Sequence, residues 1–246
     1  MGFSLTPTKE VKPMATVSII HGVPGVGKTS IMAHAPDPLF LMVKDEVGLK
    51  TLIDKGRIPA VNHFPEPAQS MEEVNAAIDA VIKGQVKCKT FVADTGNGIL
   101  SLINQQVCAE CYNNDMSQFM SFMAGFETAL PYGMAFVSKL RRLQDRGIAV
   151  SLLCHTRAKT FKNPLGPDYD RYVPQMHEKS WEILHNFADL VMFCNYEAVE
   201  TGKVGKGKIK TSTAASQAYL YPIRTAAYDA KNRHGLTGKI SMGKSG

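Results

Sequence analysis

A glycine-rich loop near the N-terminus carries the residues with the clearest chemistry. Residues 22–29 read G-V-P-G-V-G-K-T, which is the G-x-x-x-x-G-K-T spacing of a P-loop. Its glycines let the backbone wrap a phosphate, Lys28 can reach the β- and γ-phosphates, and the Thr29 hydroxyl can ligate Mg²⁺. The predicted ligands are therefore ATP and Mg²⁺. The residues predicted to bind the nucleotide are Gly22, Val23, Pro24, Gly25, Val26, Gly27, Lys28, Thr29 and Ser30.

Two acidic residues and a histidine follow apolar runs elsewhere in the chain. Asp94 ends the run T-F-V-A-D and is predicted to hold Mg²⁺ together with Thr29. Glu46 lies just beyond the run L-F-L-M-V and can polarise the attacking water, although the adjacent Asp45 can take this role instead. His155 follows another apolar run and can contact the γ-phosphate and report hydrolysis. The structural alternatives are a turn or N-cap for Asp94, a helix cap or surface position for Glu46, and a packing role for His155.

Runs of apolar residues predict the elements that bring these side chains together. Buried strands are expected at 17–20, 39–43, 90–95, 148–154 and 190–193. The principal helices are expected at 70–84, 99–112, 132–146 and 178–187. Strands that alternate with helices predict an α/β fold with a mostly parallel sheet and helices on both faces. Ligands of such sheets bind outside the carboxyl ends of the strands, which is where all of these polar residues are expected.

The chain is predicted to form one main domain. A chain of 246 residues with 44% hydrophobic content can bury one α/β core, and no apolar run approaches membrane-spanning length. The predicted boundaries are an N-terminal arm at 1–14, an ATPase domain at 15–236 and a basic tail at 237–246. Antiparallel strands at 218–223 and 225–230 are expected to close the domain. Five scattered cysteines with a single C-x-x-C indicate thiols of a reducing, cytosolic protein rather than a metal site.

The positive charge of the chain is concentrated near its C-terminus. Residues 201–246 contain nine lysines and arginines and one acidic residue, whereas the rest of the chain has nineteen basic and twenty-one acidic residues. This asymmetry is typical of a surface that faces a polyanion. A solvated basic tail without a partner explains the last residues equally well.

Residues 157–175 show no periodicity and are predicted to form a long loop. Cations in this loop alternate with the aromatic residues Phe161, Tyr169 and Tyr172. Such a mixture suits single-stranded DNA, because phosphates meet lysine or arginine while bases stack on rings. A lid without DNA contact explains the same composition. The residues predicted to bind DNA are Arg157, Lys159, Lys162 and Arg171.

These segments together resemble the RecA-like ATPases, and more closely the compact phage-type RecA-like proteins implicated in single-strand annealing and recombination. The resemblance rests on the segments GVPGVGKT, FLMVKDE, FVADT, LLCHTRAK and YDAKNRHG. It spans residues 17–235 and implies a RecA-like core with Glu46 as the water-activating base. It also implies that Lys231 and Arg233 act across a subunit interface on the neighbour's nucleotide. The loop at 157–175 stands where the family has a DNA-binding loop, and His155 stands where RecA has an amide side chain.

The leading hypothesis is an Mg²⁺-ATP-dependent ATPase in the cytoplasm of a phage-infected or other bacterial cell. It is expected to form a homo-oligomeric ring or filament, to bind single-stranded DNA, to support annealing or recombination, and to have no membrane partner. One alternative is a small-molecule or nucleotide kinase whose loop at 157–175 closes as a lid. The other is an assembly protein in which the nucleotide switches oligomeric state without DNA chemistry.

Overall fold

Six parallel strands form the centre of the molecule. They are β1 (Val17–Gly22), β2 (Pro38–Met42), β3 (Asn62–His63), β4 (Thr90–Asp94), β5 (Ala149–Phe161) and β7 (Leu190–Tyr196). Their order across the sheet is β7-β1-β5-β4-β2-β3. The structure is a computed structural model that describes residues 14–197, 199–204, 208–212 and 217–244. The predicted arm at 1–14 lies outside these residues except for Met14.

Antiparallel strands extend this sheet beyond β7. They are β10 (Gln217–Tyr221), which pairs with β7, β12 (Ile240–Lys244), which pairs with β10, and the short β11 (Lys231–Asn232), which also pairs with β7. A separate two-stranded sheet consists of β8 (Val199–Val204) and β9 (Lys208–Ser212). The predicted α/β fold with a mostly parallel sheet and antiparallel C-terminal strands is confirmed.

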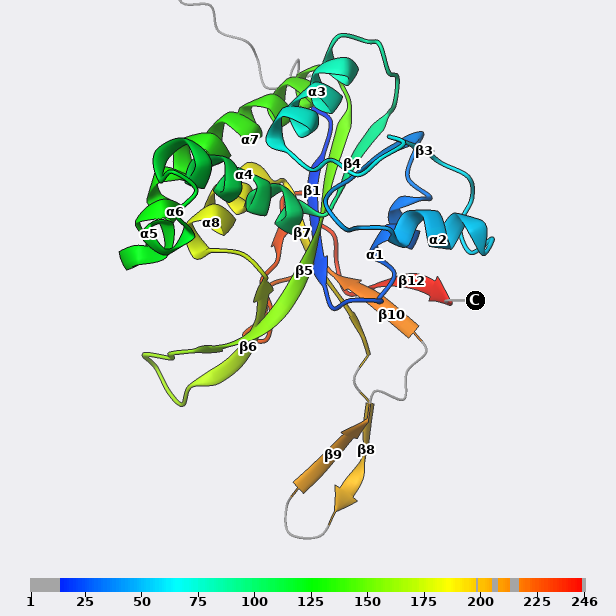
Figure 1. Cartoon of the computed structure of the whole chain (residues 1–246). Coiled ribbons are helices and arrows are strands. Elements are labelled where there is room, and N and C mark those ends of the chain that lie inside the picture. Colours follow the sequence, from blue (N-terminus) through cyan, green and yellow to red (C-terminus); the bar gives the residue numbers. More distant parts are fainter. Residues whose placement is uncertain (1–13, 198, 205–207, 213–216, 245–246) are drawn as a thin grey trace, which may run out of the picture.

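Helices cover both faces of the sheet (Figure 1). One face carries α3 (Met71–Ile82), α4 (Gly96–Cys111), α7 (Leu130–Asp145) and α8 (Glu178–Phe187), and the other carries α1 (Lys28–Met32) and α2 (Gly48–Asp54). The short helices α5 (Met116–Met120), η2 (Ser121–Met123) and α6 (Ala124–Thr128) lie beside α4 and α8. Successive residues of β1 point into different cores, because Ile19 packs with the first group of helices and Ile20 with the second.

Helix α3 shows how local sequence starts an element. The Ser70 side chain accepts a hydrogen bond from the Glu73 backbone N–H at 3.1 Å, and Glu73 in turn accepts one from the Gln69 N–H at 2.6 Å. These bonds satisfy backbone donors at the helix start. The apolar residues Val74 and Ile78 are spaced by four and are fully buried against the first core. The predicted helix at 70–84 is therefore confirmed.

The segment predicted as a loop at 157–175 is instead a hairpin. Strand β5 continues to Phe161 and pairs antiparallel with β6 (Tyr169–Pro174), from Thr156 opposite Pro174 to Phe161 opposite Tyr169. The hairpin extends away from the sheet (Figure 1), and residues 157–161 are exposed. A strand that faces water on both sides needs no alternating apolar residues, so hydrophobic periodicity did not reveal it.

Two predictions for the C-terminal part are wrong. Residues 225–230 form no strand and make only an isolated bridge from Tyr228 to Tyr172. Residues 240–244, predicted to belong to a basic tail, form β12. Ile240 and Met242 alternate along β12 and pack against the second core, which ties this segment to the sheet. Two apolar residues among glycine, serine and lysine are too weak a pattern to predict a strand.

The described residues contain no helix long and apolar enough to cross a membrane. The described part of the chain also holds no group of three or more histidine, cysteine or acidic residues placed to bind a metal. Cys108 is buried and Cys111 is exposed, and both are free thiols.

Candidate nucleotide-binding site

A pocket of about 330 Å³ lies at the carboxyl ends of the central strands. The register of the sheet explains its place, because Gly22 pairs with His155, and Asp94 pairs with both Met42 and Leu153. Strand ends far apart in the sequence therefore meet at one edge. The pocket is lined by Gly25, Gly27, Lys28, Thr29, Ser30, Glu46, Gly48, Thr51, Leu52, Asp94 and His155.

The P-loop backbone depends on glycine at two positions. A Cβ atom on Gly22 would lie 2.2 Å from the Cys194 carbonyl oxygen of β7, so no side chain fits there. Gly27 has φ 98°, a left-handed conformation that costs glycine little, and it directly precedes α1. Of the nine residues predicted to bind the nucleotide, five line the pocket. The others contribute backbone or packing, since the Val26 side chain is buried in the second core.

The Lys28 ammonium group is held against the P-loop itself. It donates hydrogen bonds to the carbonyl oxygens of Gly22 at 3.1 Å and Val23 at 3.0 Å. Only 6% of the residue is exposed, and this burial lowers the pKa of Lys28. A cation in such a desolvated position attracts an entering phosphate more strongly than one in open water.

Thr29 and Asp94 converge as predicted for a metal site. The Thr29 hydroxyl donates a hydrogen bond to Asp94 Oδ2 at 2.7 Å. Asp94 is 2% exposed, and burial raises the pKa of Asp94 to about 6 although the bond from Thr29 opposes this. A hydroxyl and a carboxylate are the oxygen donors that Mg²⁺ takes beside nucleotide phosphates, so the two residues fit this ion.

Glu46 and His155 face each other across the same pocket. His155 Nε2 lies 3.7 Å from Glu46 Oε2, and the interaction with His155 lowers the pKa of Glu46 despite partial burial. Asp45 is exposed and does not line the pocket, so the geometry favours Glu46 over Asp45. The prediction that His155 lies just past the end of a strand is wrong. The histidine lies within β5, at the point where the strand passes the last paired residue of β1.

Comparison with known protein families supports the assignment of this pocket as a nucleotide-binding site. A family model described as an AAA domain (AAA_24) matches residues 15–234. The chain belongs to this AAA domain family. It is therefore a P-loop NTPase domain, for which a nucleoside triphosphate and Mg²⁺ are the implied ligands.

Two further comparisons add no functional information. No curated protein matches the sequence. Among solved structures, the chain is similar to the flagellar accessory protein FlaH from Methanocaldococcus jannaschii, with 10% sequence identity and a TM-score of 0.43. That match covers 93% of this chain and 85% of FlaH.

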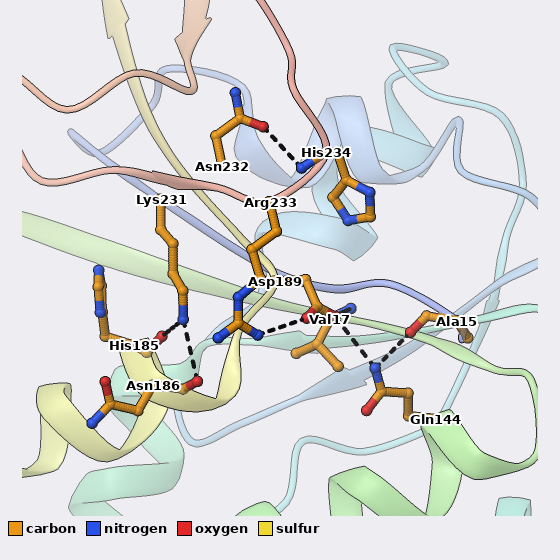
Figure 2. Close-up of polar contacts among 10 residues, drawn as sticks. All are labelled: Ala15, Val17, Gln144, His185, Asn186, Asp189, Lys231, Asn232, Arg233 and His234. Carbon is orange, nitrogen blue, oxygen red and sulfur yellow. Dashed lines mark hydrogen bonds and ion pairs between the residues drawn. The ribbon is translucent and has the colours of Figure 1, made fainter. Parts of the chain in front are cut away.

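Lys231 and Arg233 do not lie at the pocket of their own AAA domain. They follow β10 to the opposite edge of the sheet, where Lys231 of β11 pairs with Val191 near the start of β7. Figure 2 shows their contacts: Lys231 Nζ donates to the carbonyl oxygens of His185 at 2.7 Å and Asn186 at 3.2 Å, which end α8. Both carbonyls lie in the last turn of that helix, where a cation is stabilising.

Arg233 is more accessible than Lys231. Its Nη1 donates to Asp189 Oδ1 at 3.1 Å, and 57% of its side chain is exposed (Figure 2). Asp189 Oδ2 also accepts hydrogen bonds from the Val17 N–H and the Gln144 side chain. This carboxylate therefore keeps partners within the chain when Arg233 moves away.

The four cations predicted to bind DNA are in different environments. Arg157 is exposed, Lys159 pairs with Glu178, and Lys162 pairs with Asp168 at 2.7 Å. The prediction for Arg171 is wrong. It is 8% exposed and its Nη2 donates to Asp229 Oδ1 at 3.1 Å, so it serves as an internal ion pair. Its place on the inner side of β6 could not be read from a segment predicted as a loop.

Sequence reasoning missed two residues beside the P-loop. The Tyr196 hydroxyl donates to the Gly25 carbonyl oxygen at 3.1 Å, from the end of β7. His21 precedes the loop and is fully buried, with Nδ1 3.1 Å from Thr156 Oγ1 and Nε2 2.9 Å from the Asp229 carbonyl oxygen. Burial lowers the pKa of His21 to about 4. A histidine inside an apolar strand next to the motif was the available signal for the second of them.

Proposed function

We propose that this AAA domain binds and hydrolyses Mg²⁺-ATP. One observation carries the proposal: a single pocket brings together Lys28, the Thr29–Asp94 pair and the Glu46–His155 pair. These groups come from the ends of β1, β2 and β4 and from within β5, and they match the parts that phosphoryl transfer to water requires.

Each group has a distinct task in this proposal. Lys28 exchanges the P-loop carbonyls for phosphate oxygens and offsets their charge. Thr29 and Asp94 hold Mg²⁺, which supplies charge neutralisation to the phosphates. Glu46 accepts the proton of the attacking water, and its lowered pKa means that it is ionised at neutral pH. The His155 imidazole orients this carboxylate from the opposite side of the pocket.

The direct test is substitution of Glu46. E46Q should retain ATP affinity while the rate of phosphate release falls about a hundredfold, because a general base contributes at least that factor. D45N is the matched control, since Asp45 is exposed outside the pocket, and it should hydrolyse ATP at the wild-type rate. A fully active E46Q would refute the assignment. Transfer of the phosphate to a metabolite instead of water would identify a kinase.

We further propose that single-stranded DNA binds the β5–β6 hairpin and supports an annealing or recombination role. The hairpin continues the strand that carries His155 and exposes Arg157. Four residues further along β5 it pairs the rings of Phe161 and Tyr169, whose centroids are 5.3 Å apart. Exposed cations beside aromatic faces are the features that bind single strands. Ordering of the hairpin by DNA is then transmitted to the pocket along β5.

Binding of a labelled oligonucleotide at several salt concentrations tests this role. The triple variant R157A/K159A/K162A should weaken binding and reduce the salt slope by about 2, since each single-strand phosphate contact contributes about 0.7. The variant K55A/K83A/K87A removes the same charge from other exposed positions and should bind like wild type. If nucleotide changes oligomeric state but neither triple variant alters DNA binding, the protein is a nucleotide-switched assembly protein.

We also propose that the active form is a homo-oligomer in which Arg233 reaches a neighbour's nucleotide. Lys28 is the one lysine or arginine among the residues described as lining the pocket, whereas a triphosphate carries several negative charges. R233A should therefore lose hydrolysis about a thousandfold, as for an arginine finger. Mixing R233A with E46Q subunits should restore activity, because each variant supplies what the other lacks. Failure of the mixture to recover would exclude action between subunits.

A further inference from the structure

A side-chain amide links the nucleotide pocket to the root of the β5–β6 hairpin. Asn97 lies in the first turn of α4, three residues after Asp94. Its Oδ1 accepts a hydrogen bond from the His155 backbone N–H at 2.7 Å, and its Nδ2 donates one to the Gln175 carbonyl oxygen at 2.6 Å. The Gln175 N–H in turn donates to the His155 carbonyl oxygen at 2.9 Å. These three hydrogen bonds form a closed ring that joins Asn97 to both sides of the hairpin at its root.

The position of this ring in the sheet explains why an amide is needed there. The ladder with β4 ends where Asp94 pairs with Leu153, and pairing with β6 begins only at Thr156. The His155 N–H lies between these two ladders and finds its acceptor in Asn97. Because one partner is a donor and the other an acceptor, the orientation of the amide is determined by its contacts.

Asn97 is not occupied in capping its own helix. Thr95 does so, since its hydroxyl accepts a hydrogen bond from the Gly98 N–H at 3.1 Å. The side chain of Asn97 is therefore available to bind neighbouring strands. It stands between Asp94, which faces the metal position, and His155, which faces Glu46.

We propose that Asn97 is a positioning residue, which holds His155 and the root of the hairpin against the nucleotide pocket. The proposal rests on the ATP hydrolysis proposed above. A shift of the Asp94–Asn97 stretch when nucleotide and Mg²⁺ bind moves both hairpin strands through the two amide bonds. In the other direction, a displaced hairpin moves His155 away from Glu46.

Two substitutions separate the two halves of the amide. N97A removes both bonds, whereas N97D keeps an acceptor for the His155 N–H but cannot donate to Gln175. A carboxylate in the first turn of α4 favours the helix, so N97D should fold. The matched control is N104A, the same substitution two turns along α4, where no described residue hydrogen-bonds to the Asn104 side chain.

The measurements are steady-state kinetics with Mg²⁺-ATP and hydrogen exchange of the hairpin backbone. N97A should lower kcat at least about tenfold while KM stays within about twofold, because the phosphates and metal keep their ligands. Amides of residues 169–175 should exchange faster, on the order of tenfold, in both N97A and N97D. N104A should match the wild type in both measurements.

Two results would overturn the proposal. One is wild-type exchange at residues 169–175 in N97A and N97D, and the other is an unchanged kcat in N97A. If the wild type does not hydrolyse ATP, the proposed function fails. The exchange comparison of N97A with N104A then decides by itself whether Asn97 holds the hairpin root.

Discussion

The two edges of the central sheet carry similar charged residues in opposite situations. At the carboxyl edge, Lys28, Asp94 and Glu46 line a pocket of about 330 Å³. At the other edge, Lys231 and Arg233 are bound to the end of α8 and to Asp189 (Figure 2). The first group surrounds space that a ligand can fill, whereas the second group lies outside that pocket and is bound to protein partners.

The comparison shows which charged residues can bind a phosphate: those that lose little when their contacts within the protein are broken. In the proposed function Lys28 exchanges two carbonyl oxygens for phosphate oxygens, which is favourable because a buried cation is stabilised by an opposite charge. Lys231 would have to leave two carbonyl oxygens at a helix end, and those would then need water. Arg233 would leave a carboxylate that keeps two other donors. Of the two cations at this edge, Arg233 is therefore the one suited to reach another subunit.

The largest expected effect concerns Lys28. K28A should reduce ATP hydrolysis about a thousandfold, corresponding to about 4 kcal/mol, because the pocket loses the cation that stabilises the phosphates. K50A is the control, since Lys50 is an exposed lysine on α2 that pairs at 3.8 Å with Glu66. Phosphate release at saturating Mg²⁺-ATP measures both. Comparable losses in the two variants would contradict a specific role for the P-loop lysine.

The next largest effect is a pH dependence produced by Asp94. Its pKa is about 6 in the folded chain against 3.8 for the unfolded one, so the folded state favours the protonated form. Asp94 therefore adds stability below pH 4 that is lost as pH rises through about 6. The full change is about 3 kcal/mol in the free energy of unfolding.

Comparison with D94N isolates this change. His21 acts in the opposite direction over nearly the same pH range, because its pKa falls from 6.5 to about 4 and it is protonated more easily when unfolded. The wild type alone can therefore show a flat profile. Urea unfolding at several pH values should show wild type losing stability relative to D94N between pH 4 and 7. Parallel profiles would mean that Asp94 is not buried as described.

The features predicted correctly from the sequence are those that depend on residues close together in the chain. The P-loop motif, the capping pattern at Ser70 and the apolar strands needed only neighbouring residues, and the structure contains all of them. Glu46, Asp94 and His155 could be brought to one edge because parallel strands align their carboxyl ends.

The missed features depend on partners distant in the sequence. The outer part of β5 is a strand because β6 pairs with it, and Arg171 is buried because Asp229 lies opposite. The role of Asn97 becomes visible only when the fold brings His155 and Gln175 next to its side chain. None of these pairings leaves a periodic pattern in the amino-acid sequence, which is why the hairpin was predicted as a loop and Arg171 as a DNA contact.

The smallest expected effect distinguishes Lys231 from Arg233 and tests the contrast between the two edges. K231A should lower the free energy of unfolding by about 1 kcal/mol, because two carbonyl oxygens at the end of α8 lose their cation. ATP hydrolysis by the folded variant should remain close to wild type. R233A should destabilise by less, since its ion pair with Asp189 is largely exposed. If K231A instead abolishes hydrolysis at unchanged stability, Lys231 belongs with the pocket residues and the contrast between the edges fails.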